Sequence, residues 1–271
     1  MTSTTLVAVA QMTSTDNKAQ NLLYITKIIQ KAASLGVKFI SFPENFLYFS
    51  HNAKDALMSA ESLDGPSINY LRKLACDNLI YLSLGGFQEI CDEQKIYNTH
   101  IIINNLGQLT SIYRKIHLFS AKLGDGSNFN ENNSVKAGDK LVVAKTSYFN
   151  AGLSICYDMR FGELFWGLRK RGAEVILIPA AFTHITGPAH WEILLRARAI
   201  ESQSYVLAAA QIGQNNAHRR CYGHAMIVDP WGNILAQCSD CQDLAFAEIS
   251  LDYIYKIREQ MPVLDNYKEL K

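Results

Sequence analysis

The chain alternates between short runs of apolar residues and longer stretches in which apolar residues recur every three or four positions. Short apolar runs are typical of buried strands, and the second pattern is typical of helices with one buried face. We expect helices over residues 17–35, 66–77, 161–171, 188–203 and 252–261. We expect strands over residues 7–10, 37–42, 80–88, 99–103, 109–113, 141–149, 152–157, 174–179, 205–211, 225–228, 234–237 and 244–249.

Turn and loop sequences order these elements. Turns that contain Asn and Gly at residues 104–107 and 229–233 each predict a hairpin. Residues 116–140 are polar and rich in Gly and Asn, and a loop of this length is usually functional or disordered. No linker, repeat or low-complexity segment divides the chain. The alternation of strands and helices therefore predicts one layered α/β domain over residues 1–271.

The composition excludes several classes of protein. About 48% of the 271 residues are apolar, and 26 Lys and Arg residues nearly balance 25 Asp and Glu residues. A general nucleic-acid binder would carry a basic surplus or stripe. No apolar run approaches the roughly 20 residues that a membrane-spanning helix needs. We therefore expect neither a nucleic-acid partner nor a membrane partner.

The cysteines and the first residues predict the compartment. We expect no secretory signal, because the start lacks a basic segment and a cleavage site. Six cysteines lie scattered through the chain, whereas disulfide frameworks belong to small secreted domains. We expect reduced thiols and a cytoplasmic location.

Three expected strands lead into a charged or nucleophilic side chain, namely Glu44, Lys115 and Cys156. Sites in α/β folds gather at the C-terminal ends of strands. A carboxylate can accept a thiol proton and later return it to a leaving amine. An ammonium favours the thiolate and stabilises an oxyanion, for which the backbone N–H of Tyr157 is a second donor. Taken singly, each residue also has a structural interpretation, as a strand-end carboxylate, a solvated lysine or a buried cysteine.

Three segments carry a family resemblance. Phe-Pro-Glu44-Asn, Tyr-Arg-Lys115-Ile-His-Leu-Phe and Gly-Leu-Ser-Ile-Cys156-Tyr-Asp-Met-Arg-Phe resemble the signature segments of the nitrilase, or carbon–nitrogen hydrolase, superfamily. The resemblance implies a four-layer αββα sandwich and a catalytic Glu-Lys-Cys triad. It also implies a second glutamate in the loop after the lysine strand, where Glu131 stands.

Four segments in the C-terminal half resemble the Nit branch of this superfamily, at residues 179–192, 195–201, 209–213 and 222–232. That branch holds amidases of deaminated glutathione, which the chain resembles more, and ω-amidases that act on 2-oxoglutaramate or succinamate-type monoamides. The resemblance implies a hydrolase that forms an acyl thioester and needs no cofactor or metal. Its products would be 2-oxoglutarate with Cys-Gly, or 2-oxoglutarate with ammonia. It also implies at least a homodimer.

The acyl group of both substrates carries a carboxylate, so the site needs a fixed cation. Arg160 can offer a bidentate fork, and Thr183 and Thr186 can offer hydroxyl donors. A structural ion pair of Arg160 with Asp158 or Glu163 is the alternative interpretation.

Other candidate side chains favour structural roles. Cys238 and Cys241 have the spacing of half a zinc site, but a structural site needs four ligands and no second compact pair lies nearby. His184 and His190 are interpreted as structural histidines. The tryptophans are interpreted as core or interface residues, at Trp166, Trp191 and Trp231.

A function of a different class also remains open. A non-catalytic thiol-sensing or interaction protein could keep the same scaffold. Its Cys156 would react with oxidants and turn over no substrate.

Overall fold

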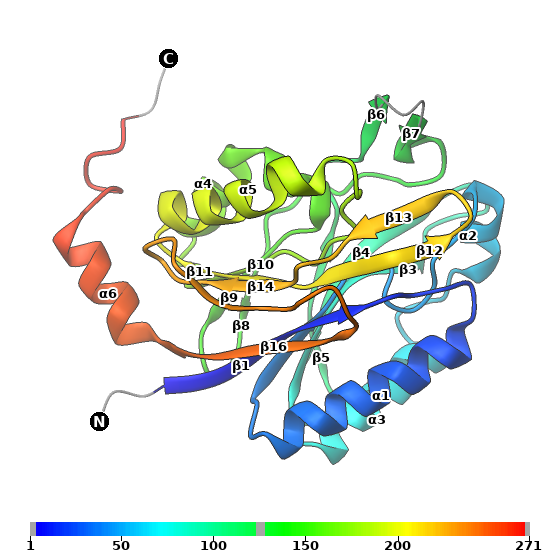
Figure 1. The fold of residues 1–271 in the computed structure, drawn as a ribbon, viewed down its shortest axis with the longest axis horizontal. Helices are drawn as coiled ribbons and strands as arrows, with labels where there is room; N and C mark the ends of the chain where they lie inside the picture. Colours follow the sequence, from blue (N-terminus) through cyan, green and yellow to red (C-terminus); the bar gives the residue numbers. More distant parts are fainter. Residues whose placement is uncertain (1–3, 123–127, 269–271) are drawn as a thin grey trace.

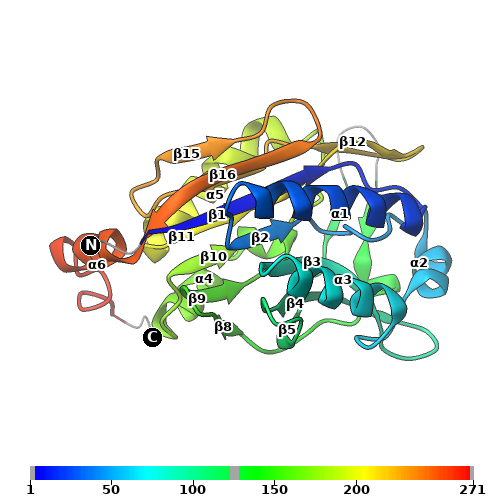
Figure 2. The ribbon, with the colours of Figure 1, turned by 90° about the horizontal axis from the view of Figure 1, so that it is seen from below.

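The computed structural model describes residues 4–122 and 128–268 and confirms the four-layer α/β architecture (Figure 1). Two mixed sheets lie face to face. Helices α1 and α3 cover the outer face of one sheet, and α4 and α5 cover the outer face of the other (Figures 1 and 2). The helices are α1 (Lys18–Ser34), α2 (Ala53–Ser59), α3 (Pro66–Asp77), α4 (Gly162–Lys170), α5 (Gly187–Ser202) and α6 (Leu251–Gln260).

The first sheet joins both ends of the chain. Its strands are β1 (Thr4–Met12), β2 (Phe39–Phe42), β3 (Tyr81–Ile90), β4 (Ile96–Ile103), β5 (Leu109–Arg114), β12 (Ala210–Asn216), β13 (Arg219–Tyr222) and β16 (Asp243–Ser250). The order is β13-β12-β1-β2-β3-β4-β5, and β16 runs antiparallel to β1 from Thr4 to Gln11. Strand β2 is parallel to both β1 and β3, so the C-terminal ends of these three strands lie on the same side of the sheet.

The second sheet carries the nucleophile candidate. Its strands are β8 (Val143–Lys145), β9 (Asn150–Leu153), β10 (Val175–Leu177), β11 (Tyr205–Ala208), β14 (Met226–Val228) and β15 (Ile234–Gln237). Their order is β15-β14-β11-β10-β9-β8, and β9, β10 and β11 are parallel. The predicted hairpin of β14 and β15 is confirmed.

Alternate side chains of the first sheet point into two different hydrophobic cores. Val7 and Val9 of β1 point into the core between the sheets, whereas Ala8 and Ala10 point toward α1 and α3. Successive strand residues point to opposite faces, and both faces of this sheet are covered. The continuous apolar runs of the sequence follow from that double burial.

The ends of α1 and α3 follow their sequence signals. The Asn17 side chain accepts from the backbone N–H of Gln20 at the start of α1. Gly36 follows the end of that helix with φ +84°, a conformation that favours glycine. Pro66 occupies the first turn of α3, where its missing N–H costs nothing.

The expected strand over residues 205–211 is two strands in different sheets. The chain leaves the second sheet at Ala208 and enters the first sheet at Ala210, with Ala209 fully buried between them. All side chains of this run are buried, so an apolar run fits the interior of either sheet equally well. Periodicity therefore cannot mark the change of sheet.

The expected strand over residues 152–157 is shorter than predicted. Strand β9 ends at Leu153, and a 3₁₀ helix begins at Cys156 and ends at Arg160. The Asp158 carboxylate accepts from the N–H of Ile155 at 2.9 Å, and the Asp158 N–H donates to the Ile155 carbonyl. This tight turn replaces the strand ladder.

The expected strand over residues 141–149 is also shorter. Strand β8 covers Val143–Lys145, because the Thr146 hydroxyl donates to the Phe149 carbonyl and closes a turn before β9. Helix α2 and strand β13 were not predicted. Both have one buried residue each, so neither shows a clear apolar pattern.

The predicted long loop contains short elements. Strands β6 (Ser120–Lys122) and β7 (Asn128–Asn130) pair, and a 3₁₀ turn follows at Glu131–Asn133. The part of the loop at residues 123–127 lies outside the described residues. Within the described ranges, no helix combines the length and the apolar character needed to cross a membrane.

Candidate active site

A cavity of about 400 Å³ brings together all eight residues that the sequence singled out. They are Glu44, Lys115, Glu131, Cys156, Tyr157, Arg160, Thr183 and Thr186. Glu44, Lys115 and Cys156 reach it from the C-terminal ends of β2, β5 and β9. The wall therefore contains residues from both sheets.

Glu44 is the most fully bonded carboxylate of the cavity. Its Oε1 accepts from Lys115 Nζ at 2.9 Å and from Asn98 Nδ2 at 3.0 Å. Its Oε2 accepts from the backbone N–H of Ala181 at 3.0 Å. Sequence reasoning did not identify Asn98 or Ala181, because a buried amide on β4 and a backbone group carry no sequence signal.

Lys115 lies between two carboxylates. Its Nζ is 2.9 Å from Glu44 Oε1 and 2.9 Å from Glu131 Oε2, and its side chain is 1% exposed. Burial alone would lower the pKa of Lys115, but the charges of Glu131 and Glu44 outweigh burial and raise the pKa above its ordinary value. The ammonium therefore stays charged at neutral pH.

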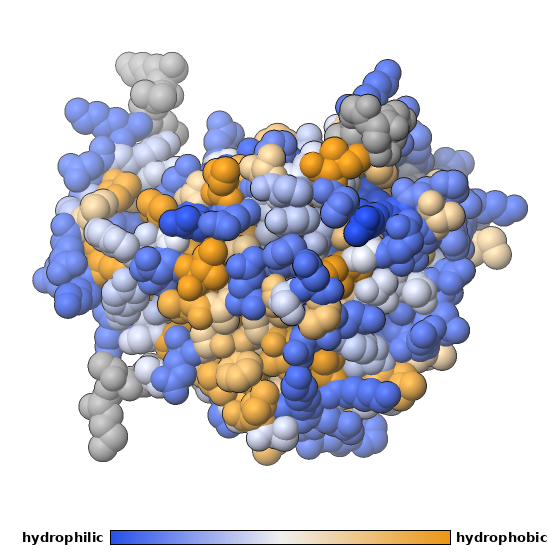
Figure 3. Space-filling view, in the orientation of Figure 1, coloured by the Kyte–Doolittle hydropathy of each residue, from blue (hydrophilic) through white to orange (hydrophobic). Residues whose placement is uncertain are grey.

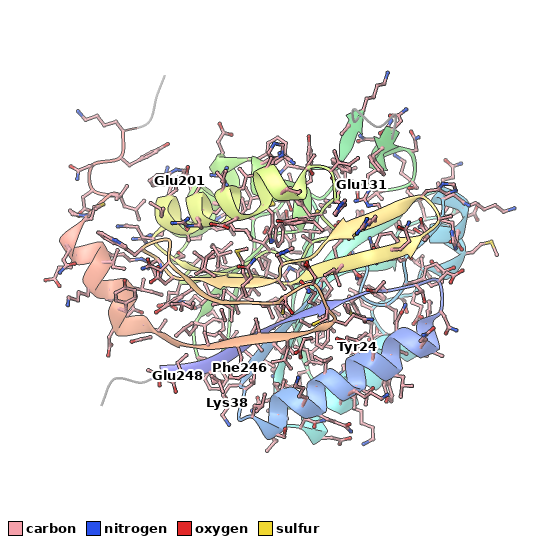
Figure 4. The ribbon with its side chains drawn as sticks, in the orientation of Figure 1. Tyr24, Lys38, Glu131, Glu201, Phe246 and Glu248 are labelled. Atoms are coloured by element: carbon pink, nitrogen blue, oxygen red, sulfur yellow. The ribbon has the colours of Figure 1, made fainter. Side chains whose placement is uncertain are left out.

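Glu131 joins the cavity from the segment after β7 (Figure 4). Its Oε2 also accepts from the backbone N–H of Phe119 at 2.7 Å. One carboxylate thus connects the ammonium of Lys115 to the loop that follows β5.

The electrostatics of Glu44 favour its ionised form. Burial would raise the pKa of this carboxyl group, but the charge and hydrogen bond of Lys115 and the hydrogen bond from Asn98 lower the pKa below its ordinary value. A carboxylate beside the thiol is therefore available as a proton acceptor at neutral pH.

Cys156 sits at a strained position. Its φ is +47°, a left-handed conformation that is uncommon for a residue with a side chain, and its N–H donates to the Pro179 carbonyl at 2.9 Å. Such strain persists where surrounding structure enforces it, often at functional sites. The strained turn points the thiol into the cavity beside Glu44.

Two opposing charges act on the pKa of Cys156. Burial and the negative charge of Glu44 raise the pKa of this thiol well above its ordinary value, and the charge of Lys115 opposes them only in part. The ammonium therefore does not make a resting thiolate. The thiol must lose its proton during attack, and Glu44 is the neighbouring acceptor.

Asp158 anchors the turn of the nucleophile. Its buried carboxylate accepts from the Tyr113 hydroxyl at 2.7 Å, and from the backbone N–H and Nδ1 of His117 at 3.0 and 2.8 Å. These bonds tie the segment on both sides of Lys115 to the turn of Cys156. Buried hydrogen bonds to a charged group are strong, so they fix Lys115 and Cys156 relative to each other.

Arg160 does not form the ion pair considered as its structural alternative. Within the described residues, it makes no salt bridge with Asp158 or Glu163, and its Nη2 lies 3.3 Å from His190 Nδ1. Its guanidinium lies 5.3 Å from the centre of the Phe182 ring and lines the cavity. It is therefore available to an anionic ligand.

The other candidates lie as follows. Thr183 and Thr186 line the cavity and share a hydrogen bond of 2.6 Å between their hydroxyl groups. His184 and His190, from the same segment of the chain, are both exposed. Trp191 is fully buried, whereas Trp231 is 54% exposed. Cys238 is buried and Cys241 is exposed, and the described part of the chain holds no group of three metal-ligating side chains.

One wall of the cavity was missed by sequence reasoning. Phe119, Phe129 and Arg219 line it, and Arg219 belongs to the unpredicted strand β13. The basic stretch at residues 218–220 was its only signal in the sequence.

Comparison with known proteins adds four findings. A family model described as carbon–nitrogen hydrolase matches residues 6–259. The chain is 44% identical over 266 residues to the deaminated glutathione amidase of Mus musculus, covering 96% of this chain and 82% of the mouse protein. It is 45% identical over 276 residues to the protein of the same name from Dictyostelium discoideum, covering 97% and 95% of the two chains. The crystal structure of the C. elegans NitFhit protein matches with a TM-score of 0.93 and 41% identity, covering 98% of this chain and 66% of that chain.

Proposed function

The chain belongs to the carbon–nitrogen hydrolase family, and from this premise we propose that it hydrolyses the amide bond of deaminated glutathione, releasing 2-oxoglutarate and Cys-Gly. The observation that carries the proposal is the placement of Cys156, Glu44 and Lys115 in one cavity with the guanidinium of Arg160, which forms no salt bridge with the described residues. A thiol, a base, a buried cation and an anion-binding group are the parts that this reaction requires.

Acylation begins with transfer of the thiol proton. Glu44 accepts the proton of Cys156 while the sulfur bonds to the amide carbon, and the carbonyl oxygen becomes an oxyanion. The Lys115 ammonium and the Tyr157 N–H stabilise that charge. Collapse then breaks the carbon–nitrogen bond, Glu44 returns the proton to the leaving nitrogen, and a thioester remains on Cys156.

Deacylation repeats the sequence with water. Glu44 takes a proton from a water molecule while the water oxygen attacks the thioester carbon. The carbon–sulfur bond breaks, the sulfur recovers a proton from Glu44, and the free acid leaves. Glu131 holds Lys115 in place through both steps.

The acyl group is held at the other end of the cavity. Its carboxylate pairs with the guanidinium of Arg160, and the hydroxyls of Thr183 and Thr186 offer further hydrogen bonds. The same contacts would bind 2-oxoglutaramate, so that ω-amidase substrate is the natural comparison.

The chemistry of Cys156 weighs against the thiol-sensing alternative. Redox-sensing cysteines are exposed and have a low pKa. Cys156 is 8% exposed, and its pKa is raised. A buried thiol beside a carboxylate is suited to attack an electrophilic carbon of a bound substrate while the carboxylate takes the proton.

The direct test is product release from deaminated glutathione by the wild-type protein and by Cys156→Ala. We expect stoichiometric 2-oxoglutarate and Cys-Gly from the wild type and none from the variant. Cys76→Ala is the matched control, because Cys76 is an exposed thiol away from the cavity. An inactive wild type would refute the substrate, and full activity of Cys156→Ala would refute the mechanism.

We also propose that the protein is cytoplasmic and that it forms a homodimer or a larger homo-oligomer. Its six cysteines are unpaired, as in a reducing compartment. Apolar side chains gather in the middle of the face shown in Figure 3. Leu235 on β15 is 42% exposed, and Phe246 on β16 is 46% exposed. Exposed apolar patches mark interaction sites, and we expect a second copy of this chain to bind here. Leu235→Glu should shift the mass in light scattering to that of a monomer, whereas Met58→Glu on α2 should not.

A further inference from the structure

The cavity contains a second arginine that the mechanism does not use. The Arg219 guanidinium lies 4.5 Å from the centre of the Phe129 ring and 5.8 Å from that of Phe119. Its Nη2 donates to the Ala181 carbonyl at 2.8 Å. Contact with two aromatic rings and a backbone hydrogen bond hold this side chain in place before any ligand arrives.

Arg219 is placed close to the reacting groups through Ala181. The N–H of Ala181 donates to Glu44, and the carbonyl of the same residue accepts from Arg219. The guanidinium of Arg219 and the carboxylate of Glu44 are therefore both hydrogen-bonded to the backbone of the same residue.

The two arginines stand at opposite ends of a row of aromatic rings. The ring of Phe119, which faces Arg219, lies 5.0 Å from the ring of Tyr157. The other end of the row is Arg160, whose guanidinium lies 5.8 Å from the centre of the Tyr157 ring. The two guanidinium groups thus lie against different aromatic rings of the cavity.

The described part of the chain offers Arg219 no anionic partner. Among the residues that the structure describes, no carboxylate lies within salt-bridge distance of Arg219, and its buried Nε has no hydrogen-bond partner. An arginine held in a partly apolar wall without a counter-charge is suited to a carboxylate of a ligand.

The proposed substrate has two carboxylates, one on each side of the scissile amide. The first belongs to the 2-oxoglutaryl group, and the second is the C-terminal carboxylate of the Cys-Gly leaving group. We propose that Arg219 binds the leaving-group carboxylate and so selects peptide-like amides over simple carboxamides. This assignment rests on the proposed function, because it concerns the substrate of the same site.

A purely structural role makes a different prediction. If Arg219 only held the Ala181 carbonyl in place, its loss would disturb Glu44 and slow every substrate equally. A role in recognising the leaving group affects only substrates that carry a carboxylate there.

The experiment compares kcat/KM for deaminated glutathione, its C-terminal carboxamide and 2-oxoglutaramate. For Arg219→Gln, we expect the ratio of deaminated glutathione to 2-oxoglutaramate to fall about 10- to 100-fold, mainly through KM. The wild type should prefer the free acid over its carboxamide, and Arg219→Gln should lose that preference. Arg219→Lys should restore part of it.

Arg220→Gln is the matched control, because Arg220 is the exposed neighbour that does not line the cavity. Its substrate ratio should equal that of the wild type. Equal losses of Arg219→Gln on all three substrates, or a wild type indifferent to the carboxamide, would overturn the role of Arg219 alone. A wild type inactive on all three substrates would overturn the proposed function and this role together.

Discussion

The Nζ atom of Lys115 lies 2.9 Å from Oε1 of Glu44, and the two side chains are 1% and 4% exposed. A buried ion pair contributes little net stability, because desolvation of both charges offsets their attraction. Its value here is chemical. Lys115 keeps Glu44 ionised beside a thiol that is itself protonated, so the site holds a base and an acid in contact.

Replacing Glu44 by Gln should strongly reduce turnover while preserving the fold. The amide removes the proton acceptor, so we expect kcat/KM to fall about 1,000-fold. Lys115 keeps its partner Glu131, so no uncompensated charge is left buried. Steady-state kinetics and circular dichroism check both parts. More than a tenth of wild-type activity in a folded Glu44→Gln protein would contradict a role as base.

The same variant should make Cys156 easier to alkylate. The charge of Glu44 raises the pKa of this thiol, so its removal lets Lys115 favour the thiolate. In the wild type, iodoacetamide should modify exposed Cys76 before Cys156 between about pH 7 and 9. Peptide mass mapping measures both rates. The interpretation fails if wild-type Cys156 reacts first, or if Glu44→Gln slows its modification.

Glu131→Gln should reduce kcat/KM about 10- to 100-fold and shift its pH profile. The amide oxygen can still accept from the Phe119 N–H, but the negative charge beside Lys115 is lost. The positive charge of Lys115 then acts on Glu44 with less compensation from Glu131, so the pKa of Glu44 falls further. We expect the acid limb of kcat/KM to move to lower pH. A loss of rate with an unmoved acid limb would indicate only a structural role.

Much of this site was readable from the sequence because its residues follow buried strands. Glu44, Lys115 and Cys156 each come after an apolar run, and their surroundings resemble family segments. Arg219 was not readable, because β13 has one buried residue and shows no alternating pattern. The protonation state of Cys156 depends on burial and on Glu44, which are distant in sequence.

The fold shows the same division. The hairpin of β14 and β15 and helix α3 follow from turn and proline signals that act locally. The change of sheet at Ala209 does not, because only tertiary pairing distinguishes the two sheets for an apolar run. The strained turn at Cys156 depends on Asp158, whose partners Tyr113 and His117 lie on another strand end.

His100 should make stability depend on pH. It is fully buried between the Ser154 carbonyl, at 2.9 Å, and the Ser83 hydroxyl, at 2.7 Å. Burial lowers its pKa to about 4, whereas an unfolded histidine titrates near about 6.5. Below about pH 6.5 the unfolded chain binds a proton at His100, whereas the folded protein leaves His100 neutral until the pH falls to about 4. The free energy of unfolding should therefore fall as pH drops from about 6.5 to about 4.

Urea unfolding across this window tests the assignment. His100→Asn should show a shallower pH dependence, by up to one proton, even if it is less stable at pH 7. His190→Asn is the control, because His190 is exposed, and it should keep the wild-type slope. An unchanged slope in His100→Asn would place the acid sensitivity elsewhere.

Partitioning of the acyl group between water and hydroxylamine tests the thioester on Cys156 most directly. Deaminated glutathione and 2-oxoglutaramate have different leaving groups but would form the same acyl-enzyme. The ratio of 2-oxoglutaryl hydroxamate to 2-oxoglutarate at a given hydroxylamine concentration should therefore be identical for both substrates, and neither product should form with Cys156→Ala. Different ratios, or hydrolysis without any hydroxamate, would contradict a common intermediate.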